Sequence, residues 1–126
     1  MKSKKILIVD DAEFMREMIE DMLDPKSYKV VGHAFNGKDA FAKYKQLTKN
    51  GLKPNIVIMD LVLPEKDGIW ATKEIIDYDK DAKILIVSAL SAPDIIKEAM
   101  ELGAKGYIPK PITIKKLLSA LTDVLS

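Results

Sequence analysis

Short continuous apolar runs alternate along this chain with longer stretches in which apolar residues recur at helical spacing. Three runs, within residues 5–9, 55–60 and 83–88, have no polar interruption and are typical of strands buried on both faces of a helix-covered parallel sheet. Residues 28–34 mix apolar and polar side chains, which favours a strand nearer the sheet edge. Residues 105–109 predict a short fifth strand.

Helical spacing between and after these strands predicts five helices. Asp24-Pro25 stops the first helix, Asn50-Gly51 closes the second, Gly103 ends the fourth and Thr113 caps the last. The first helix carries methionines that we interpret as core filler, at Met15, Met18 and Met22. The predicted helices span residues 12–23, 38–49, 68–78, 91–102 and 114–125.

The alternation of strand and helix predicts an α/β fold, a doubly wound five-stranded parallel sheet with helices on both faces. In such a sheet the carboxyl ends of all strands lie along one edge, where open α/β sheets bind their ligands. Polar residues end or directly follow four of the predicted strands. We therefore expect this edge to bring together Asp10, Asp11, Asp60, Ser88 and Lys110.

Length and composition narrow the class of protein. The 126 residues suit one compact domain, so we expect residues 1–126 to form a single unit. A net charge of +1, with basic and acidic residues interspersed, argues against direct binding of nucleic acid. Cysteine is absent, the apolar runs are too short to span a bilayer, and no signal-peptide segment is present. We expect a cytoplasmic protein without membrane contacts.

The acidic residues at the predicted edge require a counter-charge, because Asp10, Asp11 and Asp60 would repel one another. Mg²⁺ prefers oxygen ligands and commonly takes one or two carboxylates together with a phosphate oxygen. The backbone carbonyl of Val62, two residues after Asp60, could supply a further ligand. The pattern therefore indicates Mg²⁺ as the cofactor.

Two more residues at this edge suit a phosphoryl group. Lys110 is a compact positive charge with three donors, and Ser88 offers a hydroxyl to a phosphoryl oxygen. A carboxylate such as Asp60 can attack phosphorus and form an aspartyl-phosphate, a reaction that needs mainly positioning and charge neutralisation. Each residue alone is weak evidence, and the specificity comes from their combination and order.

The same residues carry a resemblance over essentially the whole chain. The segments are Ile6–Asp11, Ile58–Leu61 with Pro64 and Asp67-Gly68, Val87–Ala89, and Gly103–Pro111. With these segments the chain resembles the receiver domain of bacterial response regulators, the CheY-like family. The resemblance implies a flavodoxin-like (βα)5 fold with strand order 2-1-3-4-5. It also implies a cis bond between Lys110 and Pro111.

The resemblance assigns a role to each acidic residue. It implies that Asp60 is the phosphoacceptor and receives its phosphoryl group from a sensor histidine kinase in a Mg²⁺-dependent reaction. It implies that Asp11, Asp60 and the Val62 carbonyl bind Mg²⁺, with Asp10 helping through water. The domain would then be a signalling domain that assists its own phosphorylation and dephosphorylation, rather than an enzyme.

A conformational switch is also implied by the resemblance. Ser88 and Lys110 bind the phosphoryl oxygens, Ser88 moves toward the phosphoryl group, and Tyr107 swings inward. The face formed by the fourth helix, fifth strand and fifth helix then changes shape and selects a downstream partner. Val62 and Leu90 border the site and are expected to influence the phosphoryl lifetime. The domain is expected to be a monomer or a phosphorylation-dependent dimer.

Alternative interpretations remain open. The leading hypothesis is a two-component signalling switch, either a stand-alone chemotaxis-type regulator or an excised receiver of a transcriptional response regulator. A Mg²⁺-dependent phosphatase would need a lid domain and a second acid. A flavodoxin-like cofactor binder would need a Ser-, Thr- and Gly-rich loop where this chain has Asp10–Glu13. A receiver that no longer takes phosphate is disfavoured by the intact set of site residues. We interpret His33 as a surface or structural residue away from the acidic cluster. We interpret Trp70 as partly exposed, with a partner contact as the lesser alternative.

Overall fold

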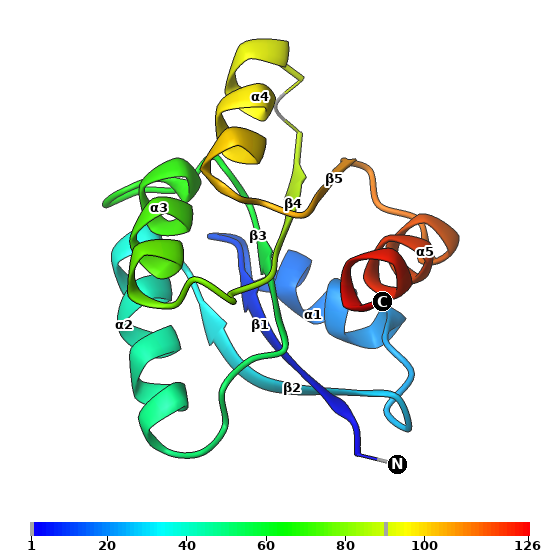
Figure 1. Ribbon diagram of the computed structural model, residues 1–126. Helices are drawn as coiled ribbons and strands as arrows, with labels where there is room; N and C mark the ends of the chain where they lie inside the picture. The colour runs from blue at the N-terminus through cyan, green and yellow to red at the C-terminus, as the bar shows by residue number, and fades with distance from the viewer. Residues whose placement is uncertain (1, 90) are drawn as a thin grey trace.

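The computed structural model describes residues 2–89 and 91–126 (Figure 1). Leu90, expected to border the site, lies outside the described residues. The strands are β1 (Lys4–Val9), β2 (Tyr28–Ala34), β3 (Ile56–Met59), β4 (Ile84–Ser88) and β5 (Gly106–Pro109). The helices are α1 (Glu13–Met22), α2 (Gly37–Lys49), α3 (Gly68–Tyr78), α4 (Pro93–Leu102) and α5 (Ile114–Leu125).

The strands form one sheet in the order β2-β1-β3-β4-β5, and every neighbouring pair is parallel. This confirms the predicted fold class and strand order. The mixed strand β2 lies at one edge, as its composition predicted. The carboxyl ends of the strands consequently lie along one edge of the sheet.

Both faces of the sheet are buried, which explains the uninterrupted apolar runs. In β1, Ile6 and Ile8 belong to one core cluster, whereas Leu7 and Val9 belong to the other. Alternate residues of a strand point to opposite faces, so a strand covered on both sides has no position for a polar side chain. Helices α1 and α5 cover one face, while α2, α3 and α4 cover the other (Figure 1).

Helix α1 departs from the sequence-based expectation. Ile19 is its one fully buried residue, and Met15 and Met22 pack partly buried against the core. Met18 is 37% exposed and Phe14 is 69% exposed, so the interpretation of the methionines as core filler is wrong for Met18. The helix contacts the sheet through a narrow stripe, and residues beside that stripe face outward.

The turns and caps follow the local signals in the sequence. The Thr113 hydroxyl accepts a hydrogen bond from the Lys116 amide at 3.2 Å, as expected of an N-cap. Gly51 and Gly103 adopt positive φ angles of 77° and 120° after the ends of α2 and α4. The Lys110–Pro111 bond is cis, as the resemblance implied. Within residues 2–89 and 91–126, none of the helices has the length and apolar character needed to cross a membrane.

Candidate functional site

Four strand ends place the predicted site residues side by side. Asp10 follows β1, Asp60 follows β3, Ser88 ends β4 and Lys110 follows β5, and these four strands are consecutive neighbours in the sheet. The backbone continues the ladder there: the Asp60 amide donates to the Val9 carbonyl at 3.0 Å, and the Lys110 amide donates to the Ser88 carbonyl at 3.1 Å. The sheet itself therefore fixes the backbone positions from which these side chains project.

Three carboxylates meet at this edge. One oxygen each of Asp10, Asp11 and Asp60 lies within 4.8 Å of the others. Asp10 and Asp60 are only 2% and 6% exposed, whereas Asp11 faces solvent. Buried carboxylates at this separation repel strongly, so the cluster needs positive charge to remain ionised.

Lys110 supplies part of that charge. Its Nζ lies 2.6 Å from Asp10 Oδ2 and 3.0 Å from Asp60 Oδ2. Burial disfavours the charged form of Lys110, but the hydrogen bonds to Asp10 and Asp60 outweigh it and raise the pKa of the ammonium group above its usual value. Lys110 therefore stays cationic and compensates one of the three carboxylates.

Asp60 is held by neutral donors as well. Its Oδ1 accepts a hydrogen bond from the Ser88 hydroxyl at 3.0 Å and another from the Val62 amide at 3.1 Å. Ser88 is completely buried, and its carbonyl accepts a long hydrogen bond of 3.4 Å from the Tyr107 hydroxyl. The carboxylate is thus preorganised, and Ser88 links it to β5.

A series of polar side chains that the sequence did not indicate leads to the backbone of Asp10. Arg16 Nη1 donates to the Asp10 carbonyl at 2.7 Å, and Arg16 Nε lies 3.3 Å from His33 Nδ1. His33 Nε2 in turn lies 2.8 Å from Glu20 Oε1. These contacts agree with the surface or structural role expected of His33, but they also connect it, through Arg16, to Asp10 in the acidic cluster. No spacing of residues in the sequence reveals this series of hydrogen bonds, since it joins β2 to one side of α1.

The donor set fits a hard divalent cation. Carboxylate oxygens are the ligands Mg²⁺ prefers, and Lys110 leaves part of the acidic charge uncompensated. Val62 lies in the loop that follows β3, with its side chain 59% exposed and its amide bonded to Asp60. Its backbone is therefore close to the cluster. The groups expected at the site thus converge on one place.

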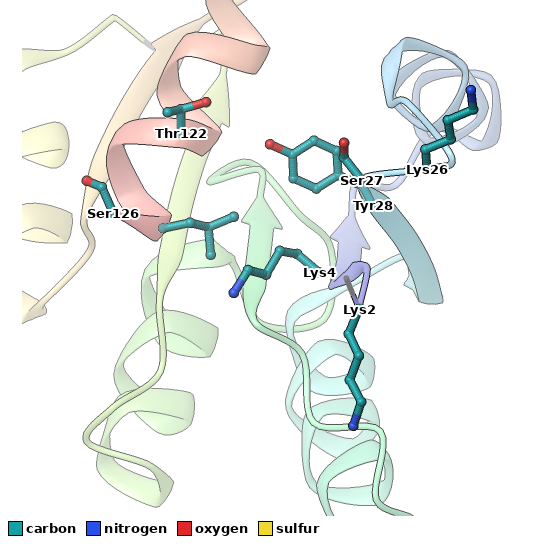
Figure 2. A pocket seen from close by; sticks show the side chains of 8 residues that line it. Lys2, Lys4, Lys26, Ser27, Tyr28, Thr122 and Ser126 are labelled. Carbon is teal, nitrogen blue, oxygen red and sulfur yellow. The ribbon is translucent and has the colours of Figure 1, made fainter.

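A hollow of about 620 Å³ lies near the amino ends of β1 and β2 and the end of α5, away from this cluster. Figure 2 shows three lysines around it, Lys2, Lys4 and Lys26, whose ammonium groups point in different directions. An anion site needs donors that converge on the ligand. The lysines of this hollow therefore do not form a binding site for an anion, and the acidic edge is the better candidate for the functional site.

The fold and the acidic edge together define a receiver domain. Residues 6–122 match the response regulator receiver domain family, and the chain belongs to that family. It is a receiver of the CheY type, a class of signalling domains.

Known relatives agree with this assignment. The chemotaxis protein CheY of Thermotoga maritima is 45% identical over 121 residues, which is 96% of this chain and 97% of the relative. The CheY of Bacillus subtilis is 42% identical over 122 residues, covering 97% and 98%. A chain in the crystal structure of the CheX–CheY–BeF3–Mg²⁺ complex from Borrelia burgdorferi matches with a TM-score of 0.90 at 30% identity, over 98% of this chain and 90% of that one.

Proposed function

We propose that Asp60 accepts a phosphoryl group and that its phosphorylation is the signal. The observation that carries this proposal is the convergence on Asp60 of a buried hydroxyl, from Ser88, and a partly buried ammonium group, from Lys110, beside two more carboxylates. In the reaction, an Asp60 oxygen forms a bond to phosphorus as the bond between phosphorus and the donor breaks. The electron pair of that bond leaves with the donor.

The surrounding residues have two roles, binding of the phosphoryl group and binding of the metal. Lys110 and Ser88 bind phosphoryl oxygens, because one provides a point charge and the other a hydroxyl donor. Asp10, Asp11, Asp60 and the Val62 carbonyl would hold Mg²⁺, which would neutralise charge on the transferred group. The Borrelia burgdorferi complex, which includes both BeF3 and Mg²⁺, supports this assignment by analogy.

The partners follow from the same proposal. A sensor histidine kinase donates the phosphoryl group, and a downstream protein reads the face formed by α4, β5 and α5. Tyr107 lies on β5, and its hydroxyl donates to the Ser88 carbonyl at 3.4 Å, which supports a connection between the site and this face. The relatives named CheY favour a role in chemotaxis. A transcriptional regulator containing this receiver is the alternative.

Phosphorylation is tested directly by intact mass. The protein is incubated with acetyl phosphate, with and without Mg²⁺, and the mass is measured over time. We expect one added phosphoryl group with Mg²⁺, its loss in Asp60→Asn, and its retention in the control Asp67→Asn. Asp67 caps α3 through the Trp70 amide at 2.9 Å, a bond that Asn also accepts.

Two results would contradict the proposal. One is an adduct that persists in Asp60→Asn, which would place the acceptor elsewhere. The other is a wild-type protein that neither gains a phosphoryl group nor binds Mg²⁺. The extent of the domain over residues 1–126, the cytoplasmic setting, the oligomeric state and a partner contact at Trp70 stay predictions.

A further inference from the structure

The loop after Asp60 is attached to a helix that lies far from it in the sequence. We define the acceptor loop as residues 61–67, between β3 and α3. Its Lys66 carbonyl accepts a hydrogen bond from the Gly37 amide at 2.8 Å, and its Glu65 carbonyl accepts one from the Lys38 amide at 3.2 Å. Gly37 and Lys38 are the first two residues of α2, whose N–H groups have no partner within the helix. Carbonyl groups of the acceptor loop therefore accept hydrogen bonds from the first N–H groups of α2.

This approach is possible only with glycine at position 37. A Cβ built there would overlap the Lys66 carbonyl oxygen and lie 2.6 Å from the Asp67 carbonyl oxygen. Both obstacles are backbone atoms, so no side-chain rotation relieves them. Gly68, the first residue of α3, approaches the start of the loop as closely, because a Cβ there would overlap the Asp60 carbonyl oxygen and lie 2.6 Å from Leu61 Cα.

The acceptor loop is strained where it meets α2. Glu65 and Lys66 have positive φ angles of 43° and 75°, a region that costs a residue with a side chain about 1 kcal/mol. Such strain persists only where the surroundings impose it. The carbonyls of these same two residues accept the bonds from α2. The conformation of the loop is thus set by its attachment and not by its local sequence.

Side chains reinforce the junction. Asn36 is 5% exposed; its Oδ1 accepts from the Asp39 amide at 2.6 Å, and its Nδ2 donates to Glu65 Oε2 at 3.4 Å. The Lys66 ammonium lies 5.8 Å from the centroid of the Trp70 ring. The junction therefore joins the end of β2, the start of α2 and the first turn of α3.

We propose that Gly37 is a positioning residue for the metal and phosphoryl site. The junction between α2 and the acceptor loop holds the loop so that the Val62 carbonyl and the Asp60 carboxylate stay in the arrangement that binds Mg²⁺. This inference rests on the proposed function. Substitution of a glycine that is needed only for folding would lower the stability of the protein and nothing else. Substitution of a positioning residue would weaken Mg²⁺ binding by more than the loss of stability explains.

The test compares Gly37→Ala with Gly51→Ala at the other end of α2. Gly51 has a φ of 77°, and a Cβ added to it would have no atom within 4 Å, so alanine there strains the backbone without touching the loop. Unfolding by urea, Mg²⁺ dissociation constants by calorimetry, and phosphorylation rates over a range of acetyl phosphate and Mg²⁺ concentrations are measured for both variants.

We expect Gly37→Ala to raise the Mg²⁺ dissociation constant at least about fivefold, with a slower phosphorylation that high Mg²⁺ partly restores. Gly51→Ala should lose stability yet keep the wild-type Mg²⁺ affinity. A folded Gly37→Ala protein with wild-type Mg²⁺ affinity would overturn the inference. So would an equal loss of affinity in both variants. If the wild type binds no Mg²⁺, the proposed function itself fails, which is a distinguishable result.

If Gly37→Ala does not fold, a measurement on the wild-type protein tests whether the junction is coupled to Mg²⁺ binding. Coupling is reciprocal, so a junction that favours Mg²⁺ binding must itself be stabilised by Mg²⁺. Amide hydrogen exchange at Gly37 and Lys38 should slow at saturating Mg²⁺, while exchange at Asn50, at the far end of α2, stays the same. Unchanged exchange at Gly37 and Lys38 would refute the coupling.

Discussion

At the scale of single residues, Lys110 balances a cluster of acids that otherwise repel. Its ammonium group lies within 3.0 Å of both Asp10 and Asp60, which are almost completely buried. Without that charge, the two carboxylates would lose their shared partner. The same position makes Lys110 a competitor for a cation, because both would neutralise the same oxygens.

We therefore predict that Lys110→Met destabilises the Mg²⁺-free protein by about 3 kcal/mol, since it leaves buried carboxylates unpaired. Saturating Mg²⁺ should remove much of this loss, because the cation takes over the missing positive charge. By linkage, the variant should bind Mg²⁺ more tightly than the wild type. Urea unfolding with and without Mg²⁺, together with calorimetry, measures all three quantities.

Lys73→Met serves as the matched control. Lys73 pairs with Asp77 at 2.9 Å, but both side chains are more than half exposed, so the change should stay within about 0.5 kcal/mol. A loss of stability in Lys110→Met that is the same with and without Mg²⁺ would contradict this account of the cluster.

At the scale of elements, a buried polar contact ties α2 to the end of α3. Tyr44, completely buried on α2, donates its hydroxyl to Asp79 Oδ2 at 2.7 Å, and Asp79 is the residue that ends α3. Lys53 Nζ lies 2.6 Å from the same oxygen. Burial and the neighbouring Asp79 both raise the pKa of the Tyr44 hydroxyl well above its usual value.

This contact predicts an alkaline loss of stability. Tyr44 ionises near pH 10 in the unfolded chain but stays protonated in the folded one, so the unfolded state is favoured as pH rises above about 10. Each further pH unit costs up to about 1.4 kcal/mol until the folded protein also ionises. Tyr44→Phe should lose about 2 kcal/mol at neutral pH and show a shallower fall above pH 10.

Unfolding by urea between pH 7 and pH 11 measures this difference. The stability curves of the wild type and Tyr44→Phe should converge as the pH rises. Curves that remain parallel over the whole range would show that Tyr44 does not stay protonated in the folded protein.

At the scale of the whole molecule, Ser88 connects the site to β5, part of the face that we propose for a partner. The Ser88 hydroxyl donates to Asp60, while the Ser88 carbonyl accepts from the Tyr107 hydroxyl on β5. A phosphoryl group on Asp60 would compete for the Ser88 hydroxyl. We therefore predict that a movement of Ser88 changes the contact of Tyr107 and, through β5, the surface that α4 and α5 present.

We predict that beryllium fluoride, a tetrahedral analogue of a phosphoryl group, alters amide hydrogen exchange in α4, β5 and α5 when Mg²⁺ is present. Strand β2, at the far edge of the sheet, should change little. Asp60→Asn should abolish the response. A response confined to the residues around Asp60 would mean that the site and the face are not coupled.

Much of this molecule could be predicted because its signals are local. Uninterrupted apolar runs identified β1, β3 and β4, and cap residues such as Thr113 placed helix ends within about two residues. The parallel sheet then brought Asp10, Asp60, Ser88 and Lys110 to one edge, as their position at strand ends predicted. Periodicity was less reliable for α1, where Met18 matches the apolar spacing yet faces solvent.

The fold class and the residues of the candidate site can be predicted from the sequence, because strand ends are marked by residues adjacent in the chain. How these residues are held in position depends on contacts that form only in the folded protein. Arg16 reaches the Asp10 carbonyl, and Gly37 admits the Lys66 carbonyl, through contacts between segments that no local pattern relates. The sequence Asn36-Gly37 indicates only a turn. It does not reveal that Gly37 must lack a side chain because the backbone of residues 66 and 67 lies against it.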